Sequence, residues 1–338
     1  MMPSTAEGSG AGVAASSDRS LASRPVPSTL YPSTSAFQPE SGSAYLSGRT
    51  QEDRSHHGDT WRDSEGVREV RITPLPEQIE VREGAECRTI SLHNRDALDS
   101  FCSGIGSDVV YLDITGLPHR AWAALLPSLL RAQLTVRAVY VEPGEYKRAR
   151  ARYQFYDLSE ADLGIGQLPG FTSIVPTGDG YSFVPILGFE DARFSYVLNE
   201  MEPPSLRRVY PIVGVPGFRP EYPFETLRSN RRTLESAPQN LFVTNARFTD
   251  AACPFRLYYT LEDIASLHPG ERMKVGLLGT KPHALGAVMY ALTHGTHQVE
   301  LIYDHPKRKG DRTRGTHRLW VYHLSAFVPM HPPDEGPQ

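Results

Sequence analysis

The feature that most constrains the fold is a regular alternation of short apolar runs with helical patterns, which begins at Asp108. Residues 108–115 (DVVYLDIT) form a continuous apolar run, residues 118–133 place their apolar side chains on one face of a helix, and a second run follows at 134–143. A strand, a helix and a strand in such close succession predict a right-handed βαβ unit and a parallel sheet.

The alternation resumes after a polar, Gly- and Pro-rich stretch at 144–180, which we interpret as a surface loop near the mouth of a site. Further strands are expected at 182–188, 207–217, 240–246, 273–278, 298–304 and, as an edge strand, 317–324. Helices are expected at 192–201, 220–237, 258–268 and 283–294. Together these elements predict an α/β fold, a three-layer Rossmann-like sandwich with a mostly parallel sheet of about six to seven strands.

The predicted organisation has one folded domain with extensions. Residues 1–65 are rich in Ser, Gly, Pro, Ala and Thr and should form a disordered N-terminal tail, because they carry too little apolar surface to offset the cost of ordering. Residues 66–106 should supply short strands and edge elements packed on the core, and residues 107–328 the Rossmann-like domain. Residues 329–338 should be a second disordered tail.

Composition excludes several classes of protein. The net charge of −4 gives no general reason for nucleic-acid binding, and the three cysteines Cys87, Cys102 and Cys253 are too scattered for a disulfide framework or a zinc site. We therefore expect no metal and no cofactor. No apolar run approaches the roughly 20 residues that span a bilayer, and the N-terminus lacks the pattern of a secretory signal. A cytoplasmic protein without membrane contact is expected.

Ligands of open parallel sheets bind beyond the carboxyl ends of the strands, so the candidate site residues are those that follow each predicted strand. These positions hold glycines, carboxylates and side chains that donate hydrogen bonds, rather than aliphatic side chains. They are Asp113, Thr115, Glu142, Gly188, Glu190, Gly214, Gly217, Arg219, Asn245, Gly279, Thr280, Lys281, His283 and Asp304.

The strongest single signal is the turn from Gly279 to His283, between a buried strand and a small-residue helix. Gly279 permits close approach to the backbone, Thr280 can cap the helix or donate to a phosphate oxygen, and Lys281 offers a point charge. The alternative is an ordinary strand–helix turn with a surface lysine. GxxxxGK[ST] is absent, which argues against P-loop chemistry.

The other strand ends leave two interpretations open. Arg219, in the loop that starts with Gly214, can clamp a phosphate or simply belong to a rigid loop. Asp113, Glu142 and Glu190 are the candidate catalytic acids or bases. Asp113 with Thr115 can also bind a ribose hydroxyl or a metal, and Glu142 can contact a ribose. The alternative for each is a capping or structural carboxylate. GxSxG and HExxH motifs are absent, so no nucleophile is indicated.

Residues 273–305 resemble a known family. A strand, then Gly279-Thr280-Lys281-Pro282, then a small-residue helix and the strand VELIYD, is similar to the late nucleotide-binding loop of CRISPR-associated Rossmann-fold (CARF-like) sensor domains. That resemblance implies binding of linear or cyclic oligoadenylates by a homodimer. The wider set of motifs, YLDITG, YVEPGEY, GFED, VGVPGFRPEY, GTKPHALG and VELIYDHP, also resembles a group of uncharacterised bacterial Rossmann-like proteins.

Three hypotheses follow. The first is a nucleotide- or phosphate-ligand-binding protein that acts as a sensor or partner subunit in a bacterial antiviral defence or stress system. The second is an enzyme on the same scaffold that hydrolyses or transfers a nucleoside or nucleotide group. The third is a non-catalytic scaffold subunit whose N-terminal tail binds a partner protein.

Overall fold

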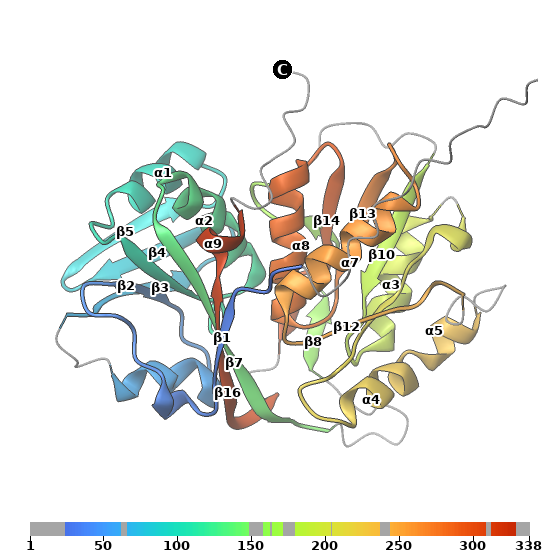
Figure 1. The fold of residues 1–338 in the computed structure, drawn as a ribbon, viewed down its shortest axis with the longest axis horizontal. Helices are drawn as coiled ribbons and strands as arrows, with labels where there is room; N and C mark the ends of the chain where they lie inside the picture. Colours follow the sequence, from blue (N-terminus) through green and yellow to red (C-terminus); the bar gives the residue numbers. More distant parts are fainter. Residues whose placement is uncertain are drawn as a thin grey trace, which may run out of the picture.

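The computed structural model describes residues 24–61, 66–148, 158–162, 164–171, 180–203, 205–236, 244–308 and 312–328. These residues form a mixed α/β protein with two large sheets that lie side by side, as Figure 1 shows.

The first sheet has eight strands in the order β1-β16-β7-β6-β2-β3-β4-β5. Its bounds are β1 (Ser28–Tyr31), β2 (Ala44–Ser47), β3 (Arg68–Pro74), β4 (Gln78–Glu83), β5 (Glu86–Ser91), β6 (Val109–Asp113), β7 (Thr135–Tyr146) and β16 (Thr313–His323). The β7-β6-β2-β3 core of the sheet is parallel, and both edges are antiparallel. Its accompanying helices are η2 (Thr34–Ala36), η3 (Asp53–Thr60), α1 (Arg95–Ser103), α2 (His119–Arg131) and α9 (Leu324–Phe327).

The second sheet has six strands in the order β12-β11-β10-β13-β14-β9. Its bounds are β9 (Gly166–Gln167), β10 (Tyr181–Ile186), β11 (Ile212–Gly214), β12 (Arg247–Thr249), β13 (Arg272–Leu277) and β14 (Val299–Tyr303). All pairs are parallel except that of β14 with β9. After the short edge strand β9, the chain enters the parallel part of this sheet at β10, builds outward to β12 and then returns to the other side of β10. The strand order therefore reverses between β10 and β13. Such a reversal creates a crevice at the carboxyl ends of the strands.

Helices cover both faces of the second sheet. They are α3 (Asp191–Met201), η4 (Leu206–Arg208), α4 (Tyr222–Ser229), α5 (Arg231–Ser236), α7 (Pro254–Ser266) and α8 (Lys281–His294), and a small pair, β8 (Ser159–Asp162) with β15 (Pro306–Arg308), lies beside them. Successive residues of β10 face opposite sides, as the period of a strand requires. Phe183 packs with Phe194 of α3, whereas Val184 belongs to the core that includes α7 and α8.

The chain path divides the molecule into two units. We call residues 24–148 and 312–328 the first unit and residues 158–308 the second unit. The chain leaves the first sheet after β7, builds the second unit, and returns through β16, which pairs with β7. Figure 1 shows β16, a late strand of the chain, beside the earlier strands β1 and β7.

The two units share one hydrophobic core. Phe255 of α7 packs against Phe327 with ring centroids 4.6 Å apart, and His119 of α2 lies 4.7 Å from the ring of Tyr303. Small residues make α8 fit tightly, since a Cβ on Gly286 would lie 2.3 Å from the carbonyl oxygen of Pro254 on α7. The helix begins at its cap Thr280, which accepts a hydrogen bond from the His283 amide, and ends at Gly295.

The single sheet predicted over residues 107–328 is wrong, although the mixed α/β class is confirmed. The strands at 109–113 and 135–146 belong to the first sheet, where β6 pairs with β2 rather than with a strand of the second unit. Periodicity locates strands, but it carries no information on which strand pairs with which.

The predicted N-terminal tail is also corrected over much of its length. Residues 24–61 supply β1, β2 and η3, and the parallel pairs of β2 place it between β6 and β3 near the middle of the first sheet. Residues 66–106 likewise complete that sheet with β3, β4 and β5. Residues 1–23 and 329–338 lie outside the described residues.

Smaller differences concern the loop at 144–180 and the strand at 240–246. β7 runs on to Tyr146, β8 and β9 lie within the loop, and the remainder of it lies partly outside the described residues. The strand expected at 240–246 is wrong over its described part, 244–246, which holds no strand, and β12 follows it at Arg247–Thr249; residues 240–243 lie outside the described residues. The three cysteines are free thiols, with Cys87 exposed. No helix in the described ranges is long and apolar enough to cross a membrane.

Candidate functional site

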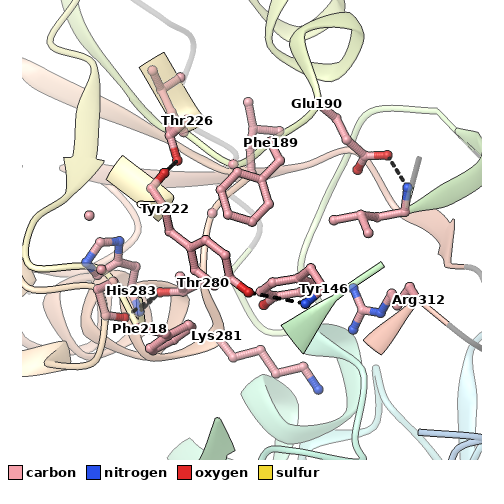
Figure 2. Close-up of a pocket in the computed structure, with 18 of the residues that line it drawn as sticks. Tyr146, Phe189, Glu190, Phe218, Tyr222, Thr226, Thr280, Lys281, His283 and Arg312 are labelled. Carbon is pink, nitrogen blue, oxygen red and sulfur yellow. Dashed lines mark hydrogen bonds between the residues drawn. The ribbon is translucent and has the colours of Figure 1, made fainter. Parts of the chain in front are cut away.

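A cavity lies between the two units at the carboxyl ends of the second sheet, and it encloses about 790 Å³, including the part of its mouth that is open to solvent. Figure 2 shows the residues that surround it. The first unit contributes Arg54, Tyr140, Tyr146 and Arg312. The second unit contributes Leu158, Leu187, Gly188, Phe189, Glu190, Arg193, Gly214, Gly217, Phe218, Tyr222, Thr226, Ala251, Leu278, Gly279, Thr280, Lys281 and His283.

Gly188, Gly214, Gly217 and Gly279, all predicted from the sequence, line this cavity. Glycine is needed at these positions because a Cβ atom would collide with neighbouring atoms of the protein. A Cβ on Gly188 would lie 2.4 Å from the Leu278 carbonyl oxygen, and one on Gly279 would lie 2.7 Å from Cγ2 of Ile186. Gly214 and Gly217 are equally confined, with Ala251 Cβ at 2.7 Å and Pro223 Cδ at 2.8 Å from the added atom. These glycines let β10, β11 and β13 end close together, which brings the loops after the strands around one space.

Three aromatic rings form one wall of the cavity. The centroids of Tyr146, Phe189 and Tyr222 are 5.4, 5.7 and 5.3 Å apart in pairs, and Figure 2 shows the rings gathered at its centre. The Tyr222 hydroxyl accepts a hydrogen bond from the Tyr146 amide at 3.2 Å, which links the two units. Burial raises the pKa of Tyr222, so its phenol stays neutral. Nearby, Phe218 packs against Tyr140 with the ring centroids 5.8 Å apart and the rings tilted by 32°.

Two arginines of the first unit share one carboxylate beside this wall. Arg54 is buried and donates from Nε to Glu52 at 2.6 Å, and from Nη1 to the Tyr140 hydroxyl and the Val141 carbonyl oxygen. Arg312 donates to the other oxygen of Glu52 at 2.7 Å. Burial alone would raise the pKa of Glu52, but the two guanidinium groups outweigh it and hold that pKa well below its usual range.

A carboxylate, that of Glu190, also lines the cavity. Glu190 accepts hydrogen bonds from the Leu158 amide at 3.0 Å and from Arg193 at 3.3 Å. Arg193 also donates two hydrogen bonds to the Asp304 carboxylate, at 2.5 and 2.7 Å. Asp304 does not line the cavity. It is fully buried and positions Arg193, which does.

The turn from Gly279 to His283 lines the cavity, but its polar groups are engaged with the protein. The Lys281 ammonium donates to the carbonyl oxygens of Ile114, Thr115 and Leu117 at 2.7, 2.6 and 2.7 Å. Figure 2 shows its amine directed away from the Tyr222 ring. The lysine therefore joins the second unit to the turn after β6.

Thr280 and His283 are bonded to the loop after β12. The Thr280 hydroxyl donates to the Ala251 carbonyl oxygen at 2.8 Å, and Nε2 of His283 donates to that of Asp250 at 2.8 Å. Burial lowers the pKa of His283 to about 4, so the ring is neutral at physiological pH.

Asp113, Thr115 and Glu142 lie outside the cavity, which corrects their predicted place in the site. The Asp113 carboxylate accepts from the Thr115 amide at 2.8 Å and lies 3.7 Å from His57. Glu142 is fully buried and accepts hydrogen bonds from His317, Arg318 and Trp320. Asp113 ends β6 and Glu142 lies within β7, so both belong to the first sheet and not to the strand ends of the second sheet that surround the cavity.

Arg219 and Asn245 are also outside the cavity. Arg219 is 43% exposed, lies 3.8 Å from Glu221 and lines a shallower groove that shares Tyr146 and Tyr222 with the cavity. Asn245 donates to the carbonyl oxygens of Arg207 and Val209. It precedes β12 instead of following it, which places it at the wrong end of the strand.

Several cavity residues were not singled out from the sequence. Phe189 and Phe218 directly follow the strand-end loops that were identified, so an aromatic residue beside a strand-end glycine is a usable signal. Arg54 lies in the stretch interpreted as a tail, where no local pattern marks it. Arg312 belongs to the run of basic residues after the strand expected at 298–304, which the sequence suggests either as a patch that binds an anion or as a solvated loop. The described residues contain no group of three or more His, Cys, Asp or Glu arranged to hold a metal ion.

Comparisons with known proteins add little. No protein-family model and no curated protein matches the chain. Among solved structures, the crystal structure of an N-terminal ketoreductase from macrolactin assembly line is similar over 80% of this chain and 73% of that chain, with 9% sequence identity and a TM-score of 0.22. This likeness is too weak to assign a function.

Proposed function

We propose that the protein binds a nucleotide, or another phosphate-bearing small molecule with an aromatic ring, in the cavity between the two units, and acts as a sensor or partner subunit. The observation that carries the proposal is the aromatic cluster of Tyr146, Phe189 and Tyr222, which lies in the same cavity as Arg54 and Arg312. The cavity occupies the carboxyl ends of a parallel sheet, where nucleotides bind in doubly wound folds.

The chemistry of the lining suits such a ligand. A nucleobase stacked on an aromatic side chain gains about 1–3 kcal/mol, and guanidinium groups bind phosphate oxygens through parallel hydrogen bonds. The resemblance of residues 273–305 to CARF-like domains extends the proposal to a homodimeric oligoadenylate sensor in bacterial defence.

Binding without catalysis is favoured because the lining groups with catalytic potential are engaged. The Thr226 and Thr280 hydroxyls donate to backbone carbonyl oxygens, and His283 is neutral and bonded to the backbone. The alternative, a nucleotide hydrolase or transferase, has one specific observation in its favour: of the three predicted catalytic carboxylates, Glu190 does line the cavity. The scaffold alternative has no described residue in its support.

A thermal-shift screen tests the binding. Nucleoside mono-, di- and triphosphates and linear and cyclic oligoadenylates are added to the wild type, to Phe189→Ala and to Phe224→Ala. Phe224 lies on α4, is 73% exposed and does not line the cavity, so it is a matched control. A ligand that binds the folded state raises Tm by mass action in the wild type and in the control, and less in Phe189→Ala. Absence of a shift with every compound would overturn the proposal.

Mass spectrometry on any compound that binds separates the sensor from the enzyme. A sensor leaves the compound intact after prolonged incubation. Conversion that is lost in Glu190→Gln would establish the enzyme alternative instead.

A further inference from the structure

We infer that the anionic group of the ligand is held by the pair Arg54 and Arg312, and not by the turn at Gly279, Thr280 and Lys281. This inference rests on the proposed function and assigns an orientation within the same cavity. It places the phosphate against the first unit, with the aromatic ring among Tyr146, Phe189 and Tyr222.

The turn has no free donor to offer from its side chains. An ammonium group has three N–H bonds, and those of Lys281 are accounted for by the carbonyl oxygens of Ile114, Thr115 and Leu117. The single hydroxyl proton of Thr280 is donated to Ala251. A phosphate bound here would have to break bonds that join the two units.

Arg54, in contrast to the side chains of the turn, has hydrogen-bond donors available for a ligand. Its side chain is 2% exposed, lines the cavity, and uses Nε and Nη1 for its bonds to Glu52, Tyr140 and Val141. Among the described residues, Nη2 of Arg54 has no hydrogen-bond partner. A buried guanidinium with unused donors at a cavity wall is stabilised by an anion that accepts from them.

The charges around the cavity give the ligand a direction. Both Arg54 and Arg312 donate to the carboxylate of Glu52, so two guanidinium groups meet one carboxylate there. Arg193 donates to both Glu190 and Asp304, so one guanidinium group meets two carboxylates. An anion is therefore attracted to the arginine pair, while the carboxylate of Glu190 faces the N–H or hydroxyl donors of the ligand.

The test compares a nucleoside with its 5′-monophosphate, using adenosine and adenosine 5′-monophosphate, or the nucleoside and nucleotide of whichever base gives the larger shift in the screen. Calorimetry is done on the wild type, Arg312→Gln and Arg314→Gln. Arg314 lies two residues after Arg312, is exposed on β16 and does not line the cavity, which makes it a nearby control of the same charge.

The wild type and Arg314→Gln should bind the nucleotide at least about tenfold more tightly than the nucleoside, because hydrogen bonds between charged groups are worth about 1.5–3 kcal/mol. Arg312→Gln should lose most of that preference while its affinity for the nucleoside is kept. Arg312→Lys, which keeps the charge, serves where the glutamine variant does not fold, and it should retain part of the preference.

The outcomes separate the two proposals. If the wild type binds neither nucleosides nor nucleotides, the proposed function fails. If it binds the nucleoside and the nucleotide equally well, or if Arg312→Gln keeps the full preference, the function stands and the assignment of the phosphate to the arginine pair is overturned.

Discussion

At the scale of single residues, the position of the Lys281 side chain is set by partners that are distant in the sequence. It is 7% exposed, and its ammonium group reaches from the start of α8 in the second unit to three backbone carbonyl oxygens after β6 in the first unit. Each bond to a charged donor stabilises the folded state, and removal of the donor leaves buried carbonyl groups without that partner.

We predict that Lys281→Met lowers the free energy of unfolding by about 2–4 kcal/mol, because several hydrogen bonds to one charged group are lost together. The matched control is Lys274→Met. The Lys274 side chain is 13% exposed; its ammonium group lies 3.5 Å from Glu300 and 4.5 Å from the centre of the Tyr181 ring, and it joins elements of the second unit alone. One ion pair and one ring contact should contribute about 1–2 kcal/mol, less than the three hydrogen bonds of Lys281. Urea denaturation monitored by circular dichroism measures both variants. Equal losses would contradict a tethering role for Lys281.

His283 gives stability a dependence on pH. Burial lowers its pKa in the folded state to about 4, below the ordinary value of about 6.5, so the folded protein binds this proton less well than the unfolded chain. The stability contributed by the neutral ring is present above pH 6.5 and is lost as the pH falls toward 4, by about 3 kcal/mol in all.

We expect His283→Gln, which keeps an N–H donor for Asp250, to remove this part of the acid destabilisation. Unfolding free energies measured by urea at pH 7.5, 6 and 5 should converge between wild type and variant as the pH falls. His93→Gln is the control, because His93 is 56% exposed. A constant difference across the range would assign the acid sensitivity to other groups.

At the scale of elements, the approach of β10 to β13 depends on glycine at the strand ends. Gly188→Ala places a Cβ 2.4 Å from a backbone carbonyl oxygen, which cannot rotate away as a side chain does. Gly276→Ala, within β13 itself, meets its nearest atoms at 3.5 Å, an ordinary contact. We predict a loss of about 1–3 kcal/mol for Gly188→Ala and a much smaller change for Gly276→Ala, measured by thermal unfolding. Similar values for both would show that the strand ends can separate without cost.

The elements themselves could be predicted from the sequence more reliably than their pairing. The helix expected at 118–133 is α2 at His119–Arg131, and the strand expected at 273–278 is β13 at Arg272–Leu277. Their apolar spacing is a local property, and so are the caps that end them. Pairing depends on contacts between distant residues, such as those of β16 with β7, and no local pattern encodes them.

At the scale of the whole molecule, the part of the candidate site that belongs to the second sheet could be predicted from the sequence, because it follows from local patterns. The strand ends of the second sheet converge because consecutive strand–helix units build one sheet, and Gly188, Gly214 and Gly279 are found together. Tyr146, Arg54 and Arg312 enter the cavity through the packing of one unit on the other. Their residue types are compatible with many surroundings, so only the tertiary structure reveals their role.

The last prediction is that the two units unfold in one transition. The three tryptophans, Trp61, Trp122 and Trp320, all lie in the first unit, whereas far-UV circular dichroism reports on the helices of both units. The units share one hydrophobic core and the Lys281 bonds, so neither should remain folded when the other is lost.

Thermal unfolding curves from tryptophan fluorescence and from circular dichroism should therefore coincide in the wild type. A fluorescence transition several degrees away from the dichroism transition would mean that the units unfold separately. In that case the cavity would form by docking of two stable bodies, and a ligand that contacts both would raise the two transitions together. If the curves coincide, ligand binding stabilises a site that the fold has already assembled.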